Sequence, residues 1–122
     1  MTVLGVMVGG ALGALCRYLV ALAFQGGSGV FAFPAATFTV NIVGSFLLAF
    51  LLFSSAALSP ELKTALGTGF LGALTTFSTF ELETLRLFDE GRWAVALAYS
   101  LGSLSVGLGA VLLGRWAALQ FS

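Results

Sequence analysis

Four largely apolar stretches, each of at least about twenty residues, dominate this chain of 122 residues. An α-helix needs roughly that length to cross the apolar core of a bilayer. Only 8% of the residues are charged, compared with about 25% in a soluble domain, so the chain lacks the groups that would cover a water-facing surface. We therefore predict an all-α integral membrane protein with four transmembrane helices in one domain, at residues 2–24, 35–58, 63–88 and 93–115.

Several functions are excluded or disfavoured by residues that the chain lacks. It has no histidine and only one cysteine, Cys16, which excludes a Cys/His metal site. Its formal net charge is +0 and it has no basic run, which argues against a nucleic-acid partner. No Lys or Arg precedes Arg17, so a cleavable signal peptide is not expected.

Apart from Arg17 inside the first span, which would give one side an excess of a single charge, the positive charges are divided evenly between the two sides of the predicted membrane protein. Lys63 and Arg115 lie on the side of the chain termini, and Arg86 and Arg92 lie on the other side. Orientation is normally set by an excess of Lys and Arg in cytoplasmic loops. Without such an excess, we expect insertion in both orientations. We also expect an antiparallel homodimer, because two-fold closure is the commonest symmetry of homo-oligomers.

Glycines mark a close contact and a turn in the first part of the chain. Gly5, Gly9 and Gly13 recur every four residues, which predicts a stripe that lets another helix approach closely. The turn-rich segment Gln25–Gly29 separates the first two spans.

The segment Gly72–Phe80, GALTTFSTF, has four hydroxyl side chains in five consecutive positions. They cannot all lie on one helix face, and Gly72 weakens a helix by about 1 kcal/mol relative to alanine. We therefore predict a break in the third helix in mid-membrane. A break frees carbonyl groups, which can hold a cation such as Na⁺. Phe77 and Phe80 share one face, where their electropositive ring edges can meet an anion.

Polar residues also occur in the first two spans. Arg17 is equally compatible with snorkelling toward the interface and with a permanent charge that attracts anions into a vestibule. Asn41 shares a helix face with Thr37, Gly44 and Ser45. We favour a polar lining along a path for this face over hydrogen bonding between helices.

The later polar residues leave two interpretations open in each case. Tyr99 and Ser103, four residues apart, form either a second track of hydroxyls or bonds to their own helix. Glu83 either lines a vestibule or pairs with Arg86, three residues further on.

These residues occur in three segments that resemble the Fluc (CrcB-type) fluoride channels, and the resemblance extends over essentially the whole chain. The segments are GALCRY at Gly13–Tyr18, VNIVGSF at Val40–Phe46 and GFLGALTTFSTF at Gly69–Phe80, of which the third is highly specific. The resemblance implies a fluoride-selective channel of the inner (plasma) membrane that lets fluoride leave the cell passively. It also implies a dual-topology, antiparallel homodimer with two pores and a structural Na⁺ at its centre.

The resemblance assigns a role to each candidate residue. Gly72 and Thr75 match the positions whose main-chain carbonyls hold Na⁺, and Arg17 and Glu83 match a first-helix arginine and a third-helix acid beside the pore. The positions that match the fluoride pore are Asn41, Phe77, Ser78, Thr79, Phe80, Tyr99 and Ser103. Two positions depart from the family pattern: Gly107 stands where the hydroxyl track would continue, and Ala49 where a glycine is usual.

Two other functions compete with a channel. A small dual-topology multidrug or cation exporter would need a carboxylate embedded in the membrane. The first three spans hold no acid before Glu81, and the deep charge of Arg17 would repel a cation. A purely structural membrane subunit would leave the hydroxyl-rich segment and the charge balance unexplained. No catalytic residues, and hence no enzyme, are predicted.

Overall fold

The structure of this protein is a computed structural model that describes residues 1–25 and 33–121. All regular secondary structure in those residues is helical. Three helices are long and apolar enough to cross a membrane among the described residues: α1 (Thr2–Ala23), α2 (Ala35–Phe53) and α6 (Trp93–Gln120). Between α2 and α6 the chain forms α3 (Pro60–Thr64), the π-helix η1 (Ala65–Leu71), α4 (Gly72–Leu74) and α5 (Ser78–Asp89). The predicted all-α class is confirmed.

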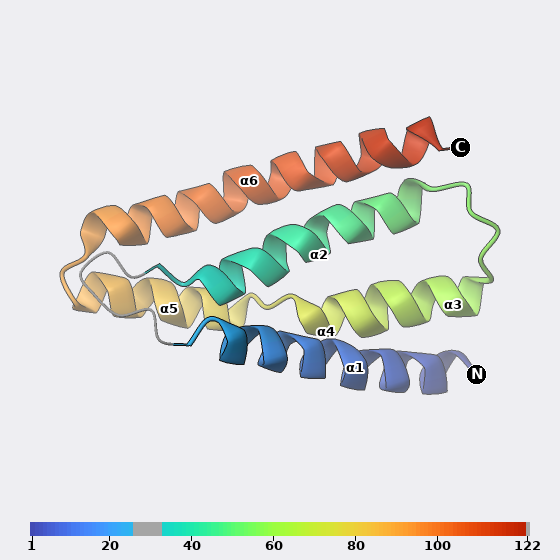
Figure 1. The fold of residues 1–122 in the computed structure, drawn as a ribbon, viewed down its shortest axis with the longest axis horizontal. Helices are drawn as coiled ribbons and strands as arrows, with labels where there is room; N and C mark the ends of the chain where they lie inside the picture. The colour runs from blue at the N-terminus through green and yellow to red at the C-terminus, as the bar shows by residue number, and fades with distance from the viewer. Residues whose placement is uncertain (26–32, 122) are drawn as a thin grey trace.

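The helices run nearly lengthwise beside one another (Figure 1). α2 packs mainly against α6, and α1 packs mainly against η1 and α4. Both chain termini and the connection from α2 to α3 lie at one end of the molecule, and the turn from α5 to α6 lies at the other (Figure 1). Lys63 in α3 and Arg115 in the last part of α6 therefore lie toward one end of the molecule. Arg86 in α5 and Arg92 before α6 lie toward the other end, as the sequence predicts.

The glycine stripe of α1 packs against the backbone of η1, as predicted. A Cβ atom at Gly13 would overlap the carbonyl group of Phe70, and one at Gly9 would overlap the carbonyl oxygen of Ala65. This contact coincides with the π-helix, in which the Gly72 N–H donates to the Gly67 carbonyl five residues back. The π-helix itself is not predicted from the sequence.

The ends of two helices differ from the predicted spans. α2 ends at Phe53, whereas the span was predicted to continue to residue 58. The chain leaves the helix at Ser54, with ψ of 141°, and the Ser54 hydroxyl accepts a hydrogen bond from the Ala56 N–H at 3.2 Å. Serine hydroxyls compete in this way with helical hydrogen bonds. α6 instead continues to Gln120, past the predicted end at residue 115. The predicted turn Gln25–Gly29 lies, apart from Gln25, outside the described residues.

Buried side chains form two small clusters rather than one core. The first cluster joins α5 to α6, and its buried members are Phe80, Leu87, Ala96 and Tyr99. The second joins α2 to η1 and α4, and its buried members are Val40, Leu71 and Leu74. Many large apolar side chains on α1 and α6 are exposed. This distribution suits a chain whose outer surface meets lipid or another protein chain instead of water.

Candidate functional site

The helical stretch that begins at Pro60 is interrupted at Thr75–Phe77, within the predicted hydroxyl-rich segment. α4 ends at Leu74, Thr75 is extended with ψ of 157°, and α5 begins at Ser78. The hydroxyls satisfy the backbone on both sides of this interruption. The Thr75 hydroxyl donates to the Leu71 carbonyl at 3.0 Å, and the Thr76 hydroxyl accepts a hydrogen bond from the Thr79 N–H at 3.3 Å.

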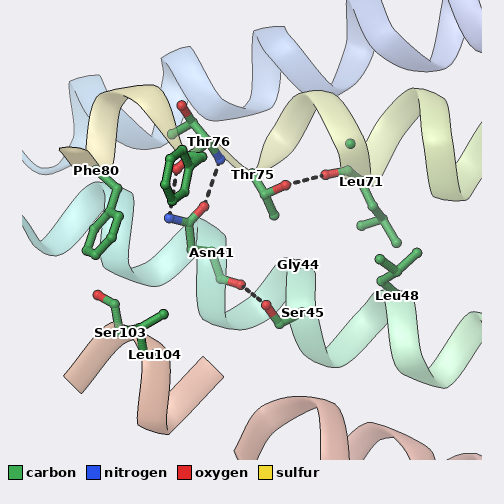
Figure 2. A pocket seen from close by; sticks show the side chains of 12 residues that line it. Asn41, Gly44, Ser45, Leu48, Leu71, Thr75, Thr76, Phe80, Ser103 and Leu104 are labelled. Carbon is green, nitrogen blue, oxygen red and sulfur yellow. Dashed lines mark hydrogen bonds between the residues drawn. The ribbon is translucent and has the colours of Figure 1, made fainter. Parts of the chain in front are cut away.

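Asn41 of α2 holds the middle of the interruption with both ends of its amide. Its Nδ2 donates to the Thr76 carbonyl at 3.0 Å, and its Oδ1 accepts a hydrogen bond from the Thr76 N–H at 2.8 Å (Figure 2). The side chain thus supplies a donor and an acceptor to a residue that has left the helix. Of the predicted polar face of α2, Ser45 donates to the Asn41 carbonyl at 2.7 Å, and Gly44 leaves room for the Thr75 methyl group.

Arg17 of α1 reaches the same segment from the other side. Its Nε donates to the Ala73 carbonyl at 3.1 Å, and the contact is partly buried. Neither of the two roles considered from the sequence, snorkelling or attracting anions, includes this hydrogen bond. Its signal in the sequence is weak: Gly13 and Arg17 are four residues apart, so the arginine follows the glycine that lets α1 approach η1.

The interruption also removes the helical partners of two carbonyl groups. In a continuous helix the Gly72 and Thr75 carbonyls would accept hydrogen bonds from the N–H groups of Thr76 and Thr79. Here the Thr76 N–H donates to Asn41, and the Thr79 N–H donates to the Thr76 hydroxyl. The two carbonyls predicted to hold a cation are therefore among those whose usual helical donors form other hydrogen bonds.

An open cavity of about 300 Å³ lies beside this interruption, between α2, the segment from η1 to α5, and α6 (Figure 2). Its lining residues are Asn41, Gly44, Ser45, Leu48, Leu71, Gly72, Thr75, Thr76, Phe77, Phe80, Ser103 and Leu104. The Ser103 hydroxyl oxygen is buried and has no hydrogen-bond partner in the described part of the chain. Its hydrogen-bonding capacity is therefore not used within that part of the chain.

The two phenylalanines of the segment line the cavity in different ways. Phe80 is 7% exposed and packs edge-on against Tyr99, with 5.1 Å between the ring centroids. Phe77 is 73% exposed, and its ring lies 6.2 Å from that of Phe80. Phe80 is thus held by its own chain, whereas Phe77 extends from the surface of a single copy.

Tyr99 and Glu83 form a second polar contact behind Phe80. The fully buried Tyr99 donates its hydroxyl to the Glu83 carboxylate at 2.9 Å. Glu83 lines a separate cavity of about 200 Å³, which Arg86 also lines. Tyr99 is not among the residues that line the cavity bordered by Ser103, so these two hydroxyls of α6 have different surroundings.

The structure gathers six of the predicted site residues around one cavity: Asn41, Gly72, Thr75, Phe77, Phe80 and Ser103. Ser78 and Thr79 open α5 behind the interruption, and Arg17 supports it from α1. Thr76, which is bonded by Asn41 and bonds Thr79, was not singled out from the sequence. Its only signal was membership of the hydroxyl-rich run.

The sequence matches the family described as CrcB-like protein, Camphor Resistance (CrcB), over residues 4–115. The chain belongs to the CrcB family. The match includes every candidate residue of the cavity and of the interruption. With its apolar helices, this CrcB-family chain is a multi-pass membrane protein, and its family is one of ion channels, not of enzymes.

Relatives within the CrcB family carry a specific name. Fluoride-specific ion channel FluC 1 of Desulfitobacterium hafniense is 50% identical over 99 residues, which cover 79% of this chain and 84% of that protein. FluC 2 of Listeria monocytogenes is 46% identical over 109 residues, covering 87% and 81% of the two chains. FluC of Saccharophagus degradans is 42% identical over 112 residues, covering 89% and 83%.

Proposed function

We propose that this chain is a fluoride-selective channel that lets fluoride leave the cell passively through the plasma membrane. The choice of fluoride is supported by the names of relatives that are 42% to 50% identical over most of both chains. We place the fluoride pathway at the cavity beside the interrupted helix. The interrupted helix, both phenylalanines and the unpartnered Ser103 hydroxyl all border it.

The interrupted stretch Pro60–Asp89 forms the fourth membrane crossing in this proposal. Its two parts, Pro60–Leu74 and Ser78–Asp89, together contain 27 helical residues, or about 40 Å at 1.5 Å per residue. That length exceeds the roughly 30 Å of a hydrocarbon core. The interruption then falls near mid-membrane. Irregular backbone is tolerated there only where it is buried in protein or lines a cavity.

An anion is stabilised in this cavity by partial charges. The N-terminus of α5 brings the positive end of a helix dipole to the interruption. The edges of the Phe77 and Phe80 rings are electropositive, and the Ser103 hydroxyl can donate a hydrogen bond. None of these groups has a formal charge, so an ion that enters is also able to leave, as conduction requires.

A structural Na⁺ fits the end of the interruption at which α4 stops, whereas the anion fits the end at which α5 begins. The stretch that ends at Leu74 brings the negative end of its dipole there, and the carbonyls of Gly72 and Thr75 have lost their usual donors. Oxygen atoms of this kind are the ligands that hard cations prefer, and unwound carbonyls coordinate Na⁺ in transporters. When bound, Na⁺ would neutralise the exposed carbonyl oxygens. Two carbonyls from one chain are too few for a complete shell, which agrees with a site shared between two copies.

Two pores in an antiparallel homodimer are supported by the exposure of Phe77 and by the open side of the cavity. The Phe77 ring is 73% exposed in a single copy, so it packs against little of its own chain, whereas a second copy could enclose it. The balanced positions of Lys63, Arg86, Arg92 and Arg115 favour neither orientation in the membrane.

The exporter remains the weaker alternative. The cavity is lined by no carboxylate, and Glu83 bonds Tyr99 and lines a different cavity. Proton-coupled export of a cation would need an acid in the substrate site.

The channel is tested by passive ion release from liposomes. Purified protein in liposomes loaded with potassium fluoride is expected to release fluoride when valinomycin supplies the compensating potassium current. Liposomes loaded with potassium chloride should retain their chloride, because the ring edges and hydroxyls fit a small, strongly accepting anion. Chloride release at a comparable rate would refute selectivity, and retention of fluoride would refute the channel.

Dual topology is tested separately with reporters at the C-terminus. Fusions to a reporter active only in the cytoplasm and to one active only outside it are both expected to give signal from the same chain. Adding three lysines after Ser122 should shift the signal toward the cytoplasmic reporter, because positive charge is retained on that side. A single orientation of the unmodified chain would contradict the proposed antiparallel assembly.

A further inference from the structure

Arg17 takes the place of a helical donor at the interrupted helix. In an unbroken helix the Ala73 carbonyl would accept a hydrogen bond from the Phe77 N–H. The chain leaves the helix at Thr75, and the Arg17 Nε donates to Ala73 at 3.1 Å instead. The arginine therefore compensates one carbonyl that the interruption would otherwise leave without a partner.

The position of Arg17 follows from the packing of α1. Gly13 lies one turn earlier on the same face and brings the α1 backbone against the Phe70 carbonyl. One turn further along α1, the arginine meets the chain three residues after Phe70, at Ala73. The Gly13–Phe70 contact and the Arg17–Ala73 hydrogen bond thus lie one turn apart along the same interface of α1.

Some carbonyl groups around the interruption accept hydrogen bonds from side chains of α1 and α2, and others belong to residues that line the cavity. Ala73 is held by Arg17 and does not line the cavity, and Thr76 is held by Asn41. Gly72 and Thr75 line the cavity, and their helical donors bond elsewhere. The side chains from α1 and α2 therefore determine which carbonyls of this segment remain open.

We propose that Arg17 is a positioning residue that acts through its Nε hydrogen bond, not through its charge. By holding the Ala73 carbonyl toward α1, it fixes the interruption and leaves the Gly72 and Thr75 carbonyls free to meet a cation. The part of this inference that concerns the cation rests on the proposed Na⁺ site. The part that concerns the interruption does not.

Two substitutions of similar length separate the hydrogen bond from the charge. In Arg17→Gln, the side-chain nitrogen lies as many bonds from Cα as the arginine Nε, so the donor is kept while the charge is lost. In Arg17→Met, a methyl group occupies that place, so both are lost. Arg115→Gln, near the end of α6, is the control for losing one positive charge elsewhere.

The first measurement is hydrogen–deuterium exchange of the peptide covering residues 72–80 in the purified, assembled protein. The second is the Na⁺ concentration that gives half-maximal protection against heat, with N-methylglucamine as the replacement cation. Arg17→Met is expected to speed exchange and raise the half-maximal Na⁺ concentration, each by at least about tenfold, the size expected when a buried carbonyl is left without a donor. Arg17→Gln and Arg115→Gln should remain within about threefold of the parent protein, which corresponds to less than 1 kcal/mol.

Equal changes in exchange in the glutamine and methionine variants would overturn the inference, because the charge would then be responsible. No change in exchange in either variant would also overturn it. If the parent protein shows no dependence on Na⁺, the proposed Na⁺ site fails, and the exchange comparison alone decides whether Arg17 fixes the interruption.

Discussion

Replacing Phe80 by isoleucine is expected to lower fluoride release from liposomes at least tenfold, which needs a barrier increase of only about 1.4 kcal/mol. Phe80 lines the cavity and is held edge-on by Tyr99, so its ring has one fixed orientation. Isoleucine keeps an apolar side chain of similar bulk in that place, but it has no electropositive ring edge to offer an anion. The expected loss is therefore one of conduction and not of folding.

The control for Phe80 is the same change at Phe50. The Phe50 ring stacks on Phe46 and lines a different, apolar cavity between α2 and η1. Phe50→Ile should remove a ring without changing fluoride release. Size-exclusion chromatography should show the same assembled species for both variants. Unchanged release by a folded Phe80→Ile variant would refute the role of the ring edge. Equal losses in both variants would attribute the effect to packing.

Replacing Asn41 by leucine is expected to have a still larger effect, about a hundredfold loss of fluoride release. Leucine is close to asparagine in shape but leaves the Thr76 N–H and carbonyl without their partners. Each unsatisfied buried group costs about 1–3 kcal/mol, so the interrupted segment should lose its fixed position. A displacement of about 1 Å at a functional site can reduce a rate by two orders of magnitude.

Ser45→Ala is the matched control for Asn41. It lies one turn further along α2, lines the same cavity and loses only a hydrogen bond to the Asn41 carbonyl. Its fluoride release should stay within a few-fold of the parent protein. Hydrogen exchange of residues 72–80 should increase in Asn41→Leu and not in Ser45→Ala. If Asn41→Leu conducts like the parent, the amide does not hold the segment in its working position.

The sequence predicted much of the fold because hydropathy and charge report directly on where helices can meet lipid. It located the helical stretches and the glycine contact of α1. It misjudged the end of α2, since Ser54–Leu58 is apolar enough to continue a span. The serine hydroxyl and extended backbone at Ser54 end the helix locally. Hydropathy also did not indicate the π-helix, which coincides with the close contact of α1.

The candidate site was predicted as a set of residue types more than as an arrangement. Phe77, Phe80, Asn41 and Ser103 do meet at one cavity. Tyr99, four residues before Ser103, donates to Glu83 and is not among the residues that line this cavity. A spacing of four residues places two side chains on one helix face, but the neighbouring helix decides what each one meets.

By itself, the sequence determined that this chain is helical and largely apolar, because these properties depend on composition and local backbone preference. Only the tertiary structure decided how the interruption is held. The Asn41 amide pairs with Thr76, and Arg17 compensates Ala73, from helices 35 and 56 residues away in the chain. These hydrogen bonds form because the glycines of α1 and Gly44 of α2 let the backbones approach closely. The glycine spacing predicts a close approach of α1, but it does not say which donors and carbonyls that approach brings together.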